Sequence, residues 1–187
     1  MRIKRVEGIL AISTNNVVGQ GDMLPWHHSG DLKRFKSITM GHGIFMGYPT
    51  FVGMAKKYAK PGKQMLPGRT LIVVGREPFD AKLDIDFSNV TILPTFGPRD
   101  DLETALKYLS PDQTLFIAGG ARIYRDYLSF AERIYLTKIE TICPTNEDTV
   151  FLTDSWSMMG GWRTITSGGS DVCDGVKANY ITMSSVI

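Results

Sequence analysis

The stretch LFIAGGARIY, residues 115–124, joins a continuous apolar run to a pair of glycines and then to a helical pattern. An apolar run of this length without polar alternation is typical of a strand that is buried on both faces. A second stretch, IFMGYPTF (44–51), ends an apolar run at Gly47 and places Pro49 where a first helical turn accepts it. Two strand-to-helix junctions of this kind favour an α/β fold with a largely parallel sheet.

The same alternation extends along the chain in both directions. We predict strands at 6–13, 43–47, 70–75, 89–93, 114–119 and 133–140, and helices at 29–40, 100–109 and 121–131, the first with Ser29 as its N-cap. Residues 162–169 and 177–187 are predicted to form a terminal hairpin around a polar, Gly-rich connection and to close one edge of the sheet. Residues 55–69 read as a basic surface insertion, and residues 1–187 as a single domain.

The composition is that of an ordinary globular protein, with 187 residues, 43% of them hydrophobic and 21% charged, and a formal net charge of +2. These values disfavour a disordered or fibrous chain, and the charge is too small to make nucleic acid the main partner. No apolar run has the length of a membrane span. With only Cys143 and Cys173 and no metal-ligand spacing, we expect no disulfide framework, no metal site and a cytoplasmic location with reduced thiols.

Both junctions lie at carboxyl ends of predicted strands, where free N–H groups at the start of a helix can hold phosphate. One such site is weak evidence because glycine at a tight turn is usually structural. Two in one sheet fit a pyrophosphate that spans a crevice. Arg76 directly follows strand 70–75 and could pair with a further phosphate, although alone it would be an ordinary exposed arginine.

Other common signatures are missing from the sequence. There is no GxGxxG after the first strand, no GxxxxGK[ST] and no GxSxG. The spacing of His27, His28 and His42 does not indicate catalysis, and we interpret all three as solvated loop residues.

Asp31 stands out in the stretch GQGDMLPWHHSGDLKRF (19–35). In a purely structural interpretation, Asp31 is an acid that the helix dipole favours in the first turn of a helix. Its apolar neighbours Pro25, Trp26, Leu32 and Phe35 favour another interpretation, because a half-buried carboxylate is costly without a partner. A planar heterocycle that offers two N–H donors would be such a partner.

Taken together, these stretches resemble the dihydrofolate reductase family over essentially the whole chain. The resemblance rests on ILAISTNNVVGQGDMLPWHHSGDLKRFK, IFMGYPTF, LPGRTLIVVGRE, FIAGGARIY and IYLTKIE, with LPW before Asp31 and Gly-Gly before Arg122 as its most specific features. It implies a central, mainly parallel eight-stranded sheet with an antiparallel C-terminal strand and flanking helices. It also implies a cis peptide bond between the paired glycines.

The resemblance further implies roles by position. Asp31 would be the single ionisable acid of the active site and would grip the 2-amino group and N3 of a pterin, with Thr137 hydrogen-bonded to its carboxylate. Residues 19–28 would be a mobile loop with Leu24 at its tip, and Trp26 would hold a structural water. Arg69 would pair with the α-carboxylate of the substrate's glutamate tail. The other implied substrate positions are Ile9, Ala11, Leu32, Phe35 and Ala118. The implied cofactor positions are Ala11, Ile12, Val18, Gly19, Gly47, Tyr48, Thr50, Gly75, Arg76, Gly119, Gly120, Ala121, Arg122, Ile123 and Tyr124, of which Thr50, Gly120 and Arg122 would face phosphate.

The implied reaction is NADPH-dependent reduction of 7,8-dihydrofolate to 5,6,7,8-tetrahydrofolate, with hydride transfer to C6 and protonation of N5. The partner is then a small molecule, and we expect a monomer. The chain departs from the family at Tyr48 and Pro49, where basic residues usually stand, so one contact to the cofactor's 2′-phosphate is lost and Arg76 is the candidate to replace it. The lysines of the basic segment either meet a polyglutamate tail or form a solvated loop; they are Lys56, Lys57, Lys60 and Lys63.

Two alternatives remain open at this point. One is a reductase of related fold that acts on another pteridine or on a ribosylamino-pyrimidine, against which Asp31 and Trp26 argue. The other is a non-catalytic nucleotide-binding module, against which the joint presence of the acid and the loop argues.

Overall fold

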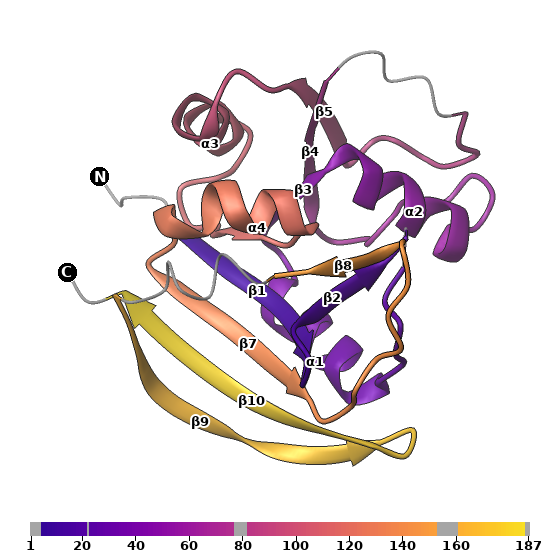
Figure 1. Cartoon of the computed structure of the whole chain (residues 1–187). Coiled ribbons are helices and arrows are strands. Elements are labelled where there is room, and N and C mark those ends of the chain that lie inside the picture. Colours follow the sequence, from indigo (N-terminus) through magenta and orange to yellow (C-terminus); the bar gives the residue numbers. More distant parts are fainter. Residues whose placement is uncertain (1–4, 22, 77–81, 153–160, 186–187) are drawn as a thin grey trace.

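A computed structural model describes residues 5–21, 23–76, 82–152 and 161–185. Its centre is an eight-stranded sheet with the order β5-β4-β3-β6-β1-β7-β10-β9 (Figure 1). The strands span β1 Val6–Ser13, β3 Gly43–Gly47, β4 Thr70–Gly75, β5 Val90–Pro94, β6 Leu115–Ile117, β7 Arg133–Ile139, β9 Trp162–Cys173 and β10 Val176–Ser185. The six strands expected from apolar runs are therefore confirmed, with ends displaced by at most a few residues.

Strand direction confirms the expected mixed sheet. β1 pairs in parallel with β6 on one side and with β7 on the other, and β3, β4 and β5 continue the parallel part. β10 runs antiparallel to both β7 and β9. The carboxyl ends of the parallel strands consequently lie along one edge of the sheet, which is where ligands bind in open α/β sheets.

Helices cover both faces of the sheet because its strands are apolar on both sides. They span α1 Ser29–Thr39, α2 Tyr48–Tyr58, α3 Pro98–Lys107 and α4 Ala121–Tyr127, and a 3-10 turn follows at Leu128–Phe130. Successive side chains of a strand point to opposite faces. Phe45 accordingly packs in one core cluster with side chains from α3 and α4, whereas Ile44 and Met46 pack in another with side chains from α2.

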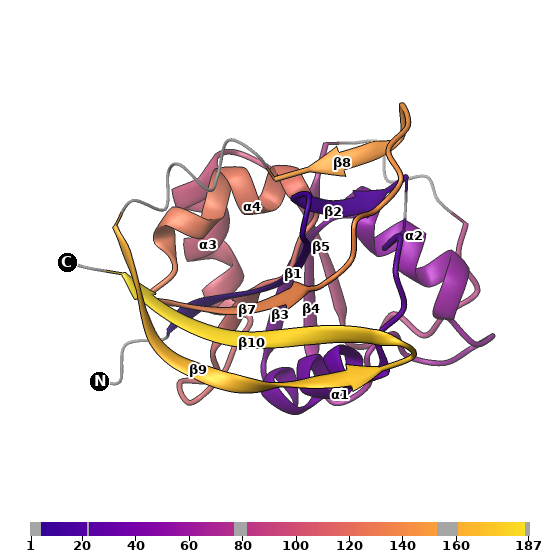
Figure 2. The ribbon, with the colours of Figure 1, turned by 60° about the horizontal axis from the view of Figure 1, so that its bottom comes forward.

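The terminal hairpin is confirmed, but the expected Gly-rich connection is wrong. β9 continues to Cys173, and the turn consists of only Asp174 and Gly175, with φ values of 55° and 76°. Positive φ at both central residues defines a tight type I′ hairpin turn, for which Asp-Gly is a preferred sequence. Figure 2 shows this hairpin lying alongside α1, so the C-terminal strands reach the segment that contains Asp31.

Two further differences concern local segments. β2 (Val17–Gln20) and β8 (Thr149–Phe151) form a small second sheet that the sequence did not indicate. The first four residues of the expected insertion at 55–69 belong to α2, with Ala55 buried in the core. Within the described ranges, no helix combines the length and the apolar character that crossing a membrane requires.

Candidate active site

A cavity of about 660 Å³ opens along the carboxyl edge of the sheet, between the β2 region, α1 and the two strand-to-helix junctions. The junctions are held together directly: the Gly47 N–H donates to the carbonyl of Gly119 at 2.8 Å, and the Ala118 N–H donates to the carbonyl of Phe45 at 2.9 Å. The order β3-β6-β1 makes these junctions neighbours although some 70 residues of sequence separate them. The predicted pairing of the two glycine sites across one crevice thus has a structural basis.

The Gly120 junction leaves room for a ligand group rather than for a side chain. The Gly119–Gly120 peptide bond is cis, as the resemblance implied, and Gly119 has a φ of 113°. A Cβ on Gly120 would come within 2.8 Å of the Thr50 hydroxyl, so any side chain at this position would displace that hydroxyl. N–H groups at the starts of α2 and α4 and the Thr50 hydroxyl form a cradle suited to phosphate.

Most of the predicted site residues line this one cavity. Those from the substrate group are Ile9, Ala11, Asp31, Leu32, Phe35 and Ala118, and Leu24 lines it from the loop. Those from the cofactor group are Val18, Gly19, Gly47, Tyr48, Thr50, Gly75, Arg76, Gly119, Gly120, Ala121, Arg122, Ile123 and Tyr124.

Four predicted residues do not line the cavity. Ile12 is 2% exposed and packs in the core, and Thr137 lies buried on β7 behind Asp31. Trp26 has a buried Nε1 atom that finds no hydrogen-bond partner in the described part of the chain. Arg69 is 6% exposed, and its Nε donates to the Leu66 carbonyl at 3.1 Å.

Sequence reasoning missed eight of the lining residues. They are Leu10, Met54, Tyr58, Val74, Thr95, Asp126, Tyr127 and Val150. Four other lining residues lie in segments that the sequence singled out without assigning them to the site: Gly21 and Met23 in the loop at 19–28, Pro49 at the start of α2, and Lys57 in the basic segment. Met54, Lys57 and Tyr58 share the α2 helix, so a helical projection from Pro49 onward would have placed them with Thr50. Val150 comes from β8, for which the sequence carried no signal.

Asp31 is a carboxylate in a mostly apolar setting. Burial raises its pKa above the ordinary value of 3.8, while a hydrogen bond from the Thr137 side chain and the positive charge of Arg34 oppose that rise. Burial also raises the pKa of Tyr124, whose hydroxyl donates to the Ile9 carbonyl at 3.1 Å. The cavity wall thus offers an acid that a donor-bearing ligand would stabilise in its charged form.

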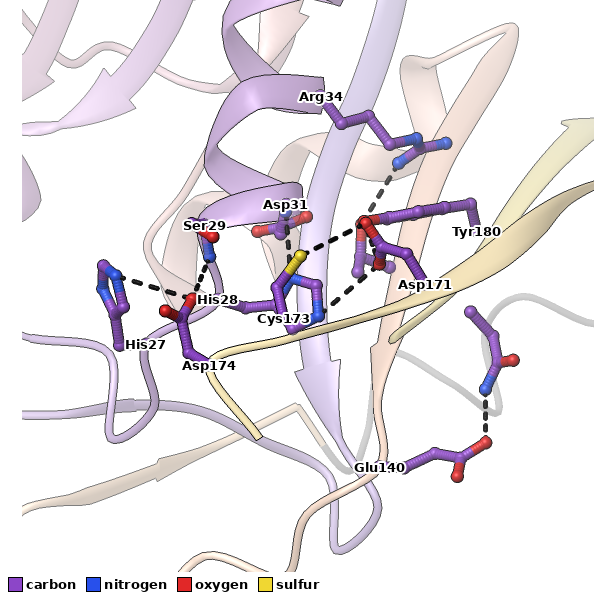
Figure 3. A network of polar contacts seen from close by, with 12 residues as sticks. His27, His28, Ser29, Asp31, Arg34, Glu140, Asp171, Cys173, Asp174 and Tyr180 are labelled. Carbon is purple, nitrogen blue, oxygen red and sulfur yellow. Dashed lines mark hydrogen bonds and ion pairs between the residues drawn. The ribbon is translucent and has the colours of Figure 1, made fainter. Parts of the chain in front are cut away.

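The N-terminus of α1 corrects two sequence interpretations. His28, not Ser29, is the N-cap: its Nδ1 accepts the Asp31 backbone N–H at 3.0 Å. His28 is 2% exposed, so its interpretation as a solvated loop residue is wrong. The Ser29 N–H donates to the Asp174 carboxylate at 2.7 Å, and this bond from the hairpin turn lowers the pKa of Asp174 (Figure 3). Helix N-terminal N–H groups need such partners, and here the distant hairpin supplies one.

His28, Asp171 and Cys173 place potential metal-ligand atoms within 4.8 Å of one another. The cap bond decides the state of the imidazole, because an Nδ1 that accepts a hydrogen bond leaves the ring hydrogen on Nε2 in the neutral form. A metal at Nε2 would move that hydrogen to Nδ1, where it would face the Asp31 N–H. The Nε2–H instead faces Asp171 Oδ1 at 3.6 Å, so the form of His28 that caps α1 differs from the form that would bind a metal through Nε2.

An acid on one wall of an apolar cavity and a phosphate cradle on another define a class of protein: an α/β oxidoreductase that holds a dinucleotide beside a flat heterocycle. The dihydrofolate reductase family model matches residues 5–171. The chain is 35% identical to the dihydrofolate reductase of Bacillus subtilis over 70% of this chain and 67% of that protein. It is 30% identical to the type 3 enzyme of Salmonella typhimurium over 94% and 95% of the two chains.

A solved structure agrees with these sequence relatives. Dihydrofolate reductase from Enterococcus faecalis, complexed with NADP(H) and RAB-propyl, superimposes with a TM-score of 0.75 at 26% identity and covers 97% of this chain and 96% of its own. The chain belongs to the dihydrofolate reductase family. It is therefore an NADPH-dependent oxidoreductase that reduces dihydrofolate, and the two alternative functions considered above are set aside.

Proposed function

We propose that this chain reduces 7,8-dihydrofolate with Asp31 as the acid that binds the pterin ring. The observation that carries the proposal is the placement of the Asp31 carboxylate in the wall of the same cavity as the Gly47 and Gly119-Gly120 junctions. An ionised carboxylate accepts two N–H donors side by side, which matches the 2-amino group and N3 of a pterin. Because burial disfavours the ionised form, two N–H donors from a bound pterin would stabilise the charged carboxylate.

The chain's residues fit NADPH through the cradle that a Cβ on Gly120 would fill. Thr50, Gly120 and Arg122 are the groups that would hold its phosphates, and NADPH supplies the hydride when bound. Asp31 orients the pterin and fixes its tautomer so that C6 receives the hydride and water supplies the proton to N5. Acid assistance of this kind contributes about 10² to 10⁴-fold.

The loop before α1 completes the site in this proposal. Met23 and Leu24 line the cavity while remaining 45% and 39% exposed, so their apolar surface is available to cover a ligand. Closure over the substrate would exclude water from the hydride path. The Nε1 of Trp26 is buried and has no hydrogen-bond partner among the described residues, which fits a donor to an ordered water beside the pterin. Asp22 of this loop lies outside the described residues.

We also infer that Arg76 contributes to the choice of cofactor. Tyr48 and Pro49 line the cavity at the positions where the family usually carries basic residues, and Arg76 lines it from the end of the neighbouring strand β4. Arg76 is exposed and can pair with a 2′-phosphate through two N–H groups.

The glutamate tail has two candidate partners. Arg69 is held in place by the Leu66 and Pro67 carbonyls and by Thr39, and burial lowers its pKa, so a carboxylate would offset the cost of its buried charge. Of the four lysines in the basic segment, Lys57 alone lines the cavity. We infer that Lys57 meets the tail and that the other three are solvated.

Three coarser inferences accompany the proposal: one domain, a monomer and a cytoplasmic location. Cys143 and Cys173 are free thiols, which a reducing compartment favours. Size-exclusion chromatography with light scattering tests the monomer, and fractionation of the source cells tests the location.

An absorbance assay at the reduced-nicotinamide band tests the function. Turnover of dihydrofolate with NADPH, faster than with NADH, is the expected result. The absence of turnover with both cofactors would overturn the proposal, and equal rates would overturn only the role of Arg76.

A further inference from the structure

Arg34 lies one turn after Asp31 on α1 and stands behind the cavity rather than in its lining. Its Nη1 donates to the Thr137 hydroxyl oxygen at 3.1 Å. Figure 3 shows the Arg34 side chain beside Tyr180, and its guanidinium carbon lies 4.8 Å from the centre of that ring. The same carbon lies 5.8 Å from the centre of the Tyr135 ring. An arginine in this position is therefore fixed by one hydrogen bond and by contacts with two aromatic faces.

The bond to Thr137 fixes the direction of a second hydrogen bond. A guanidinium has donors only, so the Thr137 oxygen must accept from Arg34. The single hydroxyl hydrogen of Thr137 is then left for another acceptor, and the Asp31 carboxylate is hydrogen-bonded to this side chain. The order of donation runs from Arg34 to Thr137 to Asp31, and every step places a hydrogen toward the carboxylate.

The support of Arg34 comes from the C-terminal hairpin. The Tyr180 hydroxyl donates to Asp171 Oδ1 at 2.8 Å, and the same carboxylate faces His28 Nε2 at 3.6 Å. A Cβ on Gly30 would overlap the Asp171 carboxylate, so this glycine allows the hairpin to approach the helix closely. The ring on which Arg34 rests is thereby tied to the first turn of α1.

Electrostatics give the arrangement a consequence for Asp31. Burial raises the pKa of this carboxyl, and the Thr137 hydrogen bond, the charge of Arg34 and His28 lower it, whereas Asp171 raises it. Tyr180 on β10 and Tyr124 on α4 also face Asp31, and burial raises the pKa of both phenols, so they stay neutral. Among the neighbours just named, Arg34 is the one whose positive charge does not depend on pH, because a guanidinium stays protonated.

We propose that Arg34 is a positioning residue that orients the Thr137 hydroxyl toward Asp31 and keeps this carboxylate ionised in a site that desolvates it. The inference deepens the proposed function and rests on the role of Asp31 in pterin binding. Arg34 does not line the cavity, so it does not contact the substrate or the reacting atoms. Its hydrogen bond acts on Asp31 through Thr137, and its charge acts on Asp31 directly.

The test compares Arg34→Met with Lys36→Met, a matched control that removes an exposed charge from the same helix. Titration of the Asp31 carboxyl is followed by ¹³C NMR in the ligand-free protein, and kcat/KM is measured against pH. In Arg34→Met the titration is expected to move to higher pH, and the acid limb of kcat/KM to move with it. At a pH on that limb, kcat/KM falls roughly tenfold, the scale of one charge-assisted hydrogen bond. Lys36→Met leaves both curves in place.

Two further variants separate the possible results. Arg34→Lys keeps the charge and is expected to return the Asp31 titration midpoint most of the way to that of the parent chain. Thr137→Val removes the hydroxyl that links Arg34 to Asp31, and it is expected to move the Asp31 titration midpoint to higher pH although Arg34 is still present. An Asp31 titration unchanged in folded Arg34→Met, or, where that variant does not fold, unchanged in Thr137→Val, overturns the inference. A titration that moves without any change in kcat/KM supports the role of Arg34 and overturns that of Asp31 in substrate binding.

Discussion

Among individual residues, Asp31 combines a functional gain with a cost in stability, because burial makes its charged form unfavourable. We expect Asp31→Asn to fold and yet to lose at least about a hundredfold in rate near neutral pH, by the scale of acid assistance. Steady-state and single-turnover kinetics with NADPH and dihydrofolate measure this loss. Activity equal to that of the parent chain would contradict the role of Asp31.

The stability of the same variant follows from the sign of the pKa shift. The folded-state pKa of Asp31 lies above its ordinary value of 3.8, so the folded protein binds the proton more tightly than the unfolded chain does. The parent chain therefore loses free energy of unfolding, relative to Asp31→Asn, as the pH rises from about 3.8 through the raised pKa. Urea unfolding of both proteins at pH 4 and pH 7 measures the difference, which is expected to favour Asp31→Asn more strongly at pH 7.

At the scale of elements, the start of α1 depends on His28. His28→Leu keeps an apolar volume but lacks an acceptor for the Asp31 N–H, and it is expected to cost about 1 kcal/mol. His28→Asn retains an acceptor and is expected to lose less. Ser29→Ala is the matched control: it keeps the backbone N–H that donates to Asp174 and removes only a side-chain contact to that exposed carboxylate, so its change should stay within about 0.5 kcal/mol. Urea denaturation curves give the three values, and a larger loss in Ser29→Ala than in His28→Leu would refute the assignment of the cap.

The elements also show how far sequence reasoning reaches. Apolar runs such as 70–75 define a strand locally, and Pro49 or a glycine pair marks the start of a helix, so these features were predictable. The cap could not be predicted, because histidine caps α1 only where Asp171, some 140 residues later, faces its other nitrogen. β2 was missed for a related reason: it is four residues long and pairs with β8, far along the chain. The contacts of Arg34 with Thr137 and with the Tyr180 ring were missed as well, because both partners are distant in the sequence and no local pattern connects them to Arg34.

At the scale of the whole molecule, the cavity is assembled from segments that span most of the chain. Residues from β1 and α1, both glycine junctions and β8 all contribute to its lining. A ligand that contacts them together binds the folded chain and not the unfolded one. Such a ligand raises the free energy of unfolding by about 2.7 kcal/mol at about 100 times its Kd. The cofactor therefore serves as a probe of the complete fold as well as of one contact.

This linkage gives a test of Arg76 that does not depend on turnover. We expect NADPH to raise the melting temperature of the parent chain more than NADH does at equal concentration, because Arg76 lines the cavity at the end of β4 and can pair with the additional phosphate. Arg76→Gln is expected to weaken NADPH binding roughly tenfold, the scale of one charge-assisted contact, and to leave NADH binding unchanged. Arg99→Gln removes the same charge from an exposed position outside the cavity lining and should preserve the difference between the two cofactors. Equal loss of NADPH and NADH binding in Arg76→Gln would assign this arginine to the shared part of the cofactor rather than to the 2′-phosphate.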